Sequence, residues 1–188
     1  MAPIRPWNQA SPLSESQYSY FEPNGYQCHT YGLQLFLPCS GTGNNNPRKY
    51  NFRSSMGGAV VMAWELNDSF NLNQAREAIA EFKALRPYFY GDYYPLTEYS
   101  ASDEAWAAFQ WDRPDQADGI VLAFRRPQAA AASINVQLHD VNPGANYEVI
   151  FDDYGITIQK GGRELAARLA IKIPEAPGSL LIKYRRLR

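Results

Sequence analysis

The stretch from Pro12 to Pro38 brings together residue types that carbohydrate chemistry uses. It holds several aromatic rings and amides, the carboxylate of Glu15, and the thiol and imidazole of Cys28 and His29. Aromatic side chains offer flat apolar faces against which a sugar ring can lie. Carboxyl groups carry out the proton transfers of glycoside cleavage. An ordinary half-buried loop contains the same mixture, so this composition leaves both interpretations open.

Cysteine and histidine are scarce, which limits metal and redox chemistry. Cys28 and Cys39 are the only cysteines, and we expect them to be reduced because no disulfide framework is visible. A zinc site from Cys28, His29 and Cys39 would lack familiar ligand spacing. His139 alternates onto the polar face of an expected strand, where a solvent-facing role is favoured. We therefore expect no metal ion and no other cofactor.

Composition places the chain among globular proteins and argues against two classes of partner. The chain has 188 residues, 45% of them hydrophobic and 20% charged, with a formal net charge of −1. The sequence has no basic run, so we expect no nucleic-acid partner and no anionic membrane surface. No apolar run approaches the roughly 20 residues that span a bilayer. No signal peptide is visible, and a cytoplasmic location is the default expectation.

The first half of the chain shows alternating helix and strand signals. Residues 26–38 predict a short, well-buried helical segment that stops before Pro38. Residues 39–51 read as a polar loop. The apolar run Gly57–Leu66 predicts a strand buried on both faces, as in a parallel sheet covered by helices. A helix should then begin at the cap Asn71 and end at Arg86–Pro87.

The second half changes to short apolar runs separated by turn formers. Seven such runs, spaced by roughly 8–14 residues, predict an antiparallel β-sandwich; they lie at 104–114, 119–127, 133–141, 146–153, 155–159, 168–174 and 179–187. The change of character falls near Gly91–Glu104. We therefore expect two domains, an α/β segment at 1–95 and an antiparallel β-sandwich at 96–188.

Several motifs, taken in order, resemble a known family. The stretches "NFRSSMGG", "FYGDYYPLTEYS" and "VLAFRRP" resemble the C-terminal portion of alpha-galactosidase-like glycoside hydrolases, which are related to family 36 of clan D. The resemblance covers about residues 12–188. It implies an α/β plus all-β fold, with the last two βα units of a TIM barrel followed by an antiparallel β-sandwich.

The resemblance also implies a retaining hydrolysis by two carboxyl groups about 5 Å apart. The family's nucleophile sits on an earlier barrel strand, which has no counterpart in these residues. Its acid/base occupies the last position of a Trp-x-Ser-Asp motif, and that position here is Gln17. A glutamine amide has no proton to give near neutral pH. Glu15 would lie about 6.5–7 Å further along a strand, too far to replace it without rearrangement.

Residues near the ends of the expected barrel strands are the candidates for contact with a sugar, because barrel enzymes bind their substrates there. They are Tyr18, Arg53, Trp64 and Glu65. Core packing is the alternative for Trp64, and an ion pair is the alternative for Arg53. Asp92 is expected to make turn hydrogen bonds and no chemistry.

Three hypotheses follow for the function. The chain is a fragment or degenerate relative of a retaining alpha-galactosidase-like hydrolase that is catalytically incomplete alone, or it binds carbohydrate without cleaving it, or it is an assembly module. Two βα units would expose apolar faces and strand edges, which drive association. We therefore expect a homo-oligomer or a complementing chain that buries Gly57–Leu66, and a monomer at micromolar concentration would contradict this expectation.

Overall fold

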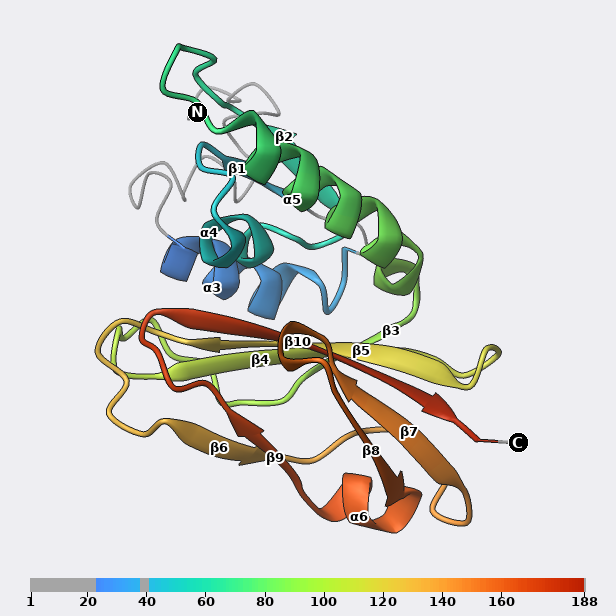
Figure 1. Ribbon diagram of the computed structural model, residues 1–188. Helices are drawn as coiled ribbons and strands as arrows, with labels where there is room; N and C mark the ends of the chain where they lie inside the picture. The colour runs from blue at the N-terminus through green and yellow to red at the C-terminus, as the bar shows by residue number, and fades with distance from the viewer. Residues whose placement is uncertain (1–22, 38–40, 188) are drawn as a thin grey trace, which may run out of the picture. The chain divides into compact units, whose positions relative to one another are not determined.

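The computed structural model describes residues 23–37 and 41–187 (Figure 1). The chain divides into two compact units, Met1–Ala84 and Leu85–Arg188. No helix in the described part of the chain has the length and apolar character needed to cross a membrane.

A pair of parallel strands with helices before, between and after them makes up the first unit. Its elements are α3 (Pro23–Leu33), β1 (Gly41–Asn44), α4 (Lys49–Ser54), β2 (Ala59–Met62) and α5 (Leu72–Leu85). Gly41 pairs with Ala59 at one end of the ladder, and Asn44 pairs with Met62 at the other. A Cβ atom on Gly41 would lie 2.1 Å from the Ala59 carbonyl oxygen, so the close approach of the two strands requires glycine there.

The helix expected after Asn71 is present. The Asn71 Oδ1 atom accepts a hydrogen bond from the backbone N–H of Gln74 at 3.0 Å, which satisfies one of the open donors of the first turn. The helix stops at Leu85, directly before Arg86 and Pro87. A 3₁₀ turn, η2 (Arg86–Tyr90), follows it. Ala75, Ala78 and Leu85 carry the buried stripe of α5, whereas Leu72 is 56% exposed.

Three expectations for the first unit are wrong. Residues 39–51 hold β1 and the start of α4, because parallel pairing imposes a strand on the small residues Gly-Thr-Gly-Asn. The helix α3 ends at Leu33, and Leu35, Phe36 and Leu37 beyond it are exposed. The strand expected over Gly57–Leu66 is confined to β2 and is not buried on both faces, since Val61 is 54% exposed and Met62 is 44% exposed.

The second unit is built on a six-stranded antiparallel sheet (Figure 1). Its order is β3-β4-β5-β10-β7-β8, and a separate antiparallel pair joins β6 to β9. The bounds are β3 (Asp92–Pro95), β4 (Trp106–Arg113), β5 (Asp118–Arg125), β6 (Ser133–Val136), β7 (Asn146–Phe151), β8 (Ile156–Gly161), β9 (Leu169–Lys172) and β10 (Gly178–Arg186). Each of the seven apolar runs forms a strand, as the sequence predicts. The turn η3 (Asp152–Tyr154) and the short helix α6 (Gly162–Ala167) flank β8.

The main core of the second unit receives side chains from both groups of strands. Val121 on β5 and Ile182 on β10 are fully buried in it, together with Val136 of β6 and Ile171 of β9. On β9 the pattern alternates, with Leu169 and Ile171 buried and the residues after them exposed. The pair β6–β9 therefore packs its apolar face against the large sheet.

Aromatic rings form a second buried layer on the large sheet. Phe89 of η2 meets Trp111 edge to face, with ring centroids 4.9 Å apart. Tyr93 and Phe109 continue this layer on β3 and β4. Much of the high aromatic content therefore serves packing in this unit.

Candidate functional site

The carboxyl ends of β1 and β2 meet at one buried amide, that of Asn44. This side chain is fully buried. Its Nδ2 group donates to the Asn51 carbonyl on α4 at 3.2 Å, and its Oδ1 atom accepts from the Trp64 indole N–H at 2.9 Å. The Ala63 N–H donates to the Asn44 backbone carbonyl at 2.8 Å. Asn44 thus ties together the ends of both strands and the helix between them.

Trp64 lies just beyond the end of β2 and is only partly buried. Besides the hydrogen bond to Asn44, its ring packs between Phe52 and Phe70, with centroid distances of 5.8 and 5.5 Å. The indole is therefore held in one orientation while part of it stays accessible. A fixed, partly exposed ring at the carboxyl end of a parallel strand is suited to contact an apolar ligand face.

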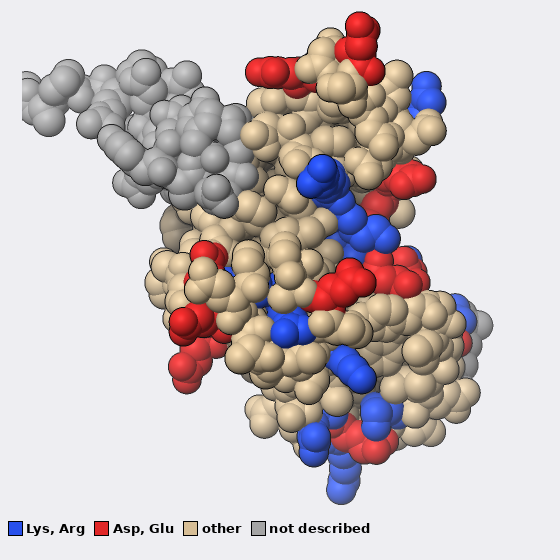
Figure 2. All heavy atoms as spheres, turned by 60° about the vertical axis from the view of Figure 1, so that its left-hand side comes forward, with Lys and Arg blue, Asp and Glu red and all other residues tan. Residues whose placement is uncertain are grey.

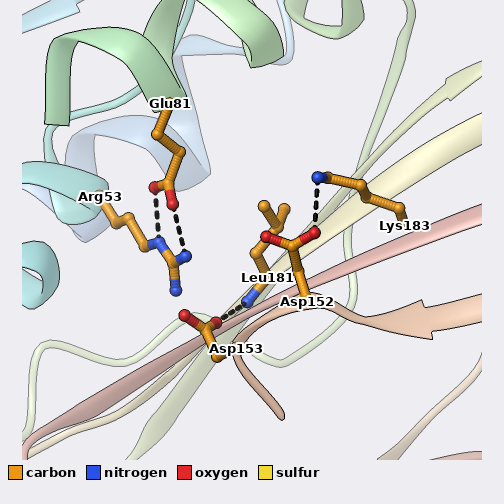
Figure 3. A network of polar contacts seen from close by, with 6 residues as sticks. All are labelled: Arg53, Glu81, Asp152, Asp153, Leu181 and Lys183. Atoms are coloured by element: carbon orange, nitrogen blue, oxygen red, sulfur yellow. Dashed lines mark hydrogen bonds and ion pairs between the residues drawn. The ribbon is translucent and has the colours of Figure 1, made fainter. Parts of the chain in front are cut away.

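Arg53 forms an ion pair between helices α4 and α5 (Figure 3). Its Nε and Nη2 atoms each lie 2.7 Å from one oxygen of the Glu81 carboxylate, so the pair is bidentate. The Arg53 side chain is 1% exposed and that of Glu81 is 22% exposed. The geometry places this guanidinium in a structural contact; the role of Arg53 in sugar binding stays a prediction.

A groove of about 440 Å³ runs between α4 and α5. Phe52 and Ala78 supply apolar surface in it. Arg48 and Lys49 line it with positive charge, and Glu77 and Glu81 line it with negative charge. The mixed lining favours no single charge of ligand.

Four predicted site residues remain, one exposed and three outside the described residues. Glu65 follows Trp64 and is exposed. Gln17, Glu15 and Tyr18 lie outside the described residues, and their roles stay predictions. Within the part of the chain that the structure describes, no group of three or more His, Cys, Asp or Glu side chains could hold a metal ion.

Asn44 is the member of this site that sequence reasoning missed. It stands in the run "GTGNNNP", which reads as a polar loop. No local signal marks it, because residues 41–44 become a strand only through their pairing with residues 59–62, and a local pattern does not show such pairing.

A second polar cluster lies inside the second unit. The Tyr184 hydroxyl donates to Asp112 at 2.5 Å, and the Gln110 amide donates to the Tyr184 oxygen at 2.7 Å. The same amide group of Gln110 donates to the His139 carbonyl at 2.9 Å and accepts from the His139 N–H at 2.8 Å. These hydrogen bonds connect β4 to β10 and to the segment after β6.

Burial dominates the acid–base behaviour of this cluster. Asp112 is 4% exposed, and its burial raises the pKa of the carboxyl to about 6. The hydrogen bond from Tyr184 acts in the opposite direction, while the nearby charges of Asp140, Asp92 and Asp118 add to the increase. Burial and the Asp112 charge also raise the pKa of Tyr184. The members satisfy one another away from solvent, which indicates a structural network.

One hydrogen bond and one ion pair in this unit fix the η3 turn. Asp153 accepts a hydrogen bond from the Leu181 N–H at 2.9 Å, and Lys183 lies 2.6 Å from Asp152 (Figure 3). Elsewhere on the molecule, acidic and basic side chains are interspersed on the face shown in Figure 2. Neither sign of charge gathers into one continuous area on that face.

Solved structures similar to this chain include alpha-galactosidases. The galactosidase domain of the alpha-galactosidase-sucrose kinase AgaSK aligns with a TM-score of 0.66 and 21% identity. The GH36 alpha-galactosidase AgaB from Geobacillus stearothermophilus aligns with a TM-score of 0.68 and 20% identity. A variant of AgaA from the same organism, solved with 1-deoxygalactonojirimycin, aligns with a TM-score of 0.70 and 18% identity. This chain has the fold of part of a GH36 alpha-galactosidase.

The alignment covers most of this chain but only a small part of each enzyme. In each of these comparisons it covers 89% of this chain and 25% of the other chain, so the protein spans about a quarter of the length of the enzymes it matches. Neither a scan against protein-family models nor a search of curated proteins gives a match. The likeness to GH36 enzymes therefore rests on fold and on the short motifs, at low sequence identity.

Proposed function

We propose that this chain is a part of a retaining alpha-galactosidase-like glycoside hydrolase and that it does not cleave glycosides by itself. The observation that carries the proposal is the fold match over 89% of the chain to a quarter of several GH36 enzymes. The order of the motifs in the sequence supports the same family independently of the fold.

In this proposal the two units correspond to two parts of such an enzyme. The parallel pair β1–β2 with its helices α4 and α5 represents the last two βα units of a TIM barrel. The second unit represents the β-sandwich that follows the barrel. Barrel enzymes assemble their sites at the carboxyl ends of the strands, where Asn44 and Trp64 lie in this chain.

The proposed substrate contact is the exposed part of the Trp64 indole. A double variant of AgaA has been solved in complex with stachyose, and a galactoside of that kind is the ligand class we propose for this chain. Glu65 follows Trp64 and is exposed, so its carboxylate could accept hydrogen bonds from sugar hydroxyls. Tyr18 belongs to the proposed contact set as well. Arg53 would support the set through Glu81, by fixing α4 beside Trp64.

The proposed catalytic deficit lies in the acid/base position. Retaining hydrolysis requires two carboxyl groups about 5 Å apart, one as nucleophile and one as acid/base. Gln17 cannot supply the acid, and the residues of this chain provide no match for the nucleophile strand of the family. The proton transfer to the leaving oxygen would have to come from a group that another part of the enzyme provides.

The test of this function is an activity assay on the 188-residue chain with an aryl alpha-galactoside. We expect no release of nitrophenol above the rate of the buffer. A rate of nitrophenol release that increases with protein concentration and persists after further purification would contradict the proposed catalytic deficit.

A second candidate function, carbohydrate binding without cleavage, is favoured by the fixed and partly exposed ring of Trp64. Calorimetric titration with galactose and raffinose-type sugars tests it. We expect Trp64→Leu to reduce affinity at least tenfold, while Tyr90→Ala, at a 63% exposed ring in the other unit, should leave it unchanged. Equal affinity of both variants would remove Trp64 from the binding site.

A further inference from the structure

A polar hollow of about 340 Å³ lies on the second unit and is lined by no residue of the first. It is surrounded by the end of β3, by the end of β6 with the segment after it, and by the junction of α6 with β9. The elements β6, β9 and α6 lie on the same side of the large sheet (Figure 1). The volume of the hollow falls within the range of roughly 300–1,000 Å³ that is usual for pockets that bind small molecules.

The polar side chains of the hollow come from a regular alternation along the chain. Val136 and Leu138 are each 3% exposed and belong to the main core. Asn135, Gln137 and His139 alternate with them and are exposed on the other face, where all three line the hollow. The same pattern that builds the core therefore directs three neighbouring polar side chains toward one place.

The backbone that carries these side chains is fixed by contacts from two other elements. The fully buried amide of Gln110 on β4 donates to the His139 carbonyl at 2.9 Å and accepts from the His139 N–H at 2.8 Å. The Leu138 N–H donates to the carbonyl of Leu165 on α6 at 3.0 Å. Asp140 has a φ of 55°, an uncommon conformation for a residue other than glycine, which these contacts maintain. The segment is therefore ordered before any ligand arrives.

The ring of His139 also has a fixed orientation. It stacks on the ring of Tyr94, with centroids 4.7 Å apart and planes inclined by 16°. The Tyr94 hydroxyl donates to the carboxylate of Asp140, the next residue in the chain. Within residues 23–37 and 41–187, the ring nitrogens of His139 have no hydrogen-bond partner, so they are available to a ligand in the hollow.

Arg168 supplies a positive charge to the hollow. It follows α6 directly, and its Nε atom donates to the Asn135 Oδ1 atom at 2.8 Å. In the described part of the chain, its two terminal nitrogens have no partner. They form a planar fork of the kind that binds a carboxylate through two parallel hydrogen bonds. No Asp or Glu is among the described residues that line the hollow, so a ligand carboxylate would meet no acidic side chain in that lining.

We propose that this hollow binds a sugar acid, such as a uronic acid, with the carboxylate of the ligand on Arg168. The Gln137 amide offers a donor and an acceptor to the hydroxyl groups. Pro95 and Leu96 add a small apolar wall for the C–H face of the sugar ring. The proposal does not depend on the proposed hydrolase function, because every residue that carries it belongs to the second unit.

The charge of the hollow favours this ligand over two others. A carboxylate carries a single negative charge, which matches the single charge of Arg168, whereas a phosphate monoester carries close to two near neutral pH. A neutral sugar lacks the group that the guanidinium fork fits. Its hydroxyl groups would leave the charge of Arg168 without a counter-charge.

The experiment is a titration of the nitrogen-15-labelled 188-residue chain with D-galacturonate, followed by the NMR shifts of the backbone amides. We expect saturable shifts in residues 135–139 and 167–168, with a dissociation constant on the order of 1 mM or lower. D-galactose, which has a hydroxymethyl group in place of the carboxylate, is the matched ligand and should bind there at least tenfold more weakly. Shifts around Trp64 report separately on the carbohydrate binding considered for the first unit.

Substitutions of two arginines test whether the fork of Arg168 holds the carboxylate. We expect Arg168→Met to lower the affinity for galacturonate at least tenfold, and Arg168→Lys, which keeps the charge without the fork, to cause a smaller loss. Arg163→Met, at an exposed arginine on α6, is the control and should leave the affinity unchanged. Circular dichroism checks that all three variants keep the fold.

Three results would overturn the proposal. The first is the absence of saturable shifts in residues 135–139 and 167–168 with galacturonate. The second is equal affinity of these residues for galacturonate and galactose, which would remove the carboxylate from the recognition. The third is an equal loss of affinity in Arg168→Met and Arg163→Met, which would indicate a general attraction between charges.

Discussion

At the scale of single residues, the two arginines of the motif "AFRRP" serve structure. Arg126 is 2% exposed, and its Nη1 atom donates to the carbonyls of Ser100 and Ser102 at 2.7 and 2.8 Å. Arg125 donates to the carbonyls of Ala129, Ile173 and Pro174. Both guanidinium groups therefore hold loops against the sheet. A motif that supports the family resemblance thus carries information about the fold and none about the reaction.

Replacement of Arg126 by Met tests this role. The variant keeps much of the side-chain volume but removes the donor from the carbonyls of Ser100 and Ser102. Hydrogen bonds to a charged group contribute roughly 1.5–3 kcal/mol each. Because both of these bonds are only partly buried, we expect a smaller total loss of about 2–4 kcal/mol in the free energy of unfolding. Urea denaturation measures it. Arg163→Met, at an exposed position on α6, is the control and should change this free energy by less than about 0.5 kcal/mol. Equal stability of the two variants would contradict the assignment.

The buried carboxyl of Asp112 predicts a specific dependence of stability on pH. Burial raises its pKa from the ordinary 3.8 to about 6, so the folded state holds the proton more tightly than the unfolded state. The contribution of this group to the free energy of unfolding is therefore fully present below pH 3.8 and falls as the pH rises to about 6. Above that value it is constant. The total change is on the order of 3 kcal/mol.

The variant Asp112→Asn removes this titration. We expect the free energy of unfolding of the variant, minus that of the parent protein, to increase as the pH rises from 4 to 6. Between pH 7 and 8 this difference should be constant. Urea denaturation at unit steps of pH measures both curves. Parallel curves over the whole range would show that Asp112 does not titrate as proposed.

At the scale of elements, the sequence predicts most of the second unit and less of the first. Strands such as β5 and β10 are continuous apolar runs between turn formers, and the signal for each is local. The strand β1 is Gly-Thr-Gly-Asn, whose intrinsic preference is for a turn. Only its pairing with β2 makes it a strand, and pairing between distant segments is not visible in a local pattern. For the candidate site, the position of Trp64 led to the prediction of a sugar contact, which stays a prediction, and no pattern pointed to its hydrogen-bond partner Asn44.

The cap of α5 gives a prediction at this scale. Asn71 was identified from its type and place, and its side chain accepts the Gln74 N–H. Asn71→Ala leaves that donor without a protein partner, and a lost N-cap of this kind costs about 1 kcal/mol. Asn73→Ala, two residues later and also exposed, is the matched control and should lower the stability less. Thermal melts of both variants, followed by the helical signal at 222 nm, make the comparison. A melting temperature lowered equally by both would rule out a specific cap.

At the scale of the whole molecule, the two units differ strongly in their cores. Among the described residues, only Tyr26, Phe52, Met56, Ala75 and Ala78 are buried apolar side chains of the first unit. The second unit has two extensive buried layers, one between its two groups of strands and one of aromatic rings. Burial of apolar surface is the main stabilising contribution to folding, so the first unit should be the less stable one.

This difference predicts a stepwise response to protease. In native buffer we expect the first unit to open locally and to be cut first, because local opening is most frequent where few apolar contacts must be broken. A resistant fragment should remain that begins near Leu85 and holds all strands from β3 to β10. Mass spectrometry of a trypsin time course identifies its ends. Simultaneous loss of both units, or early cuts within β4 and β5, would contradict the view of a stable second unit joined to a less stable first one.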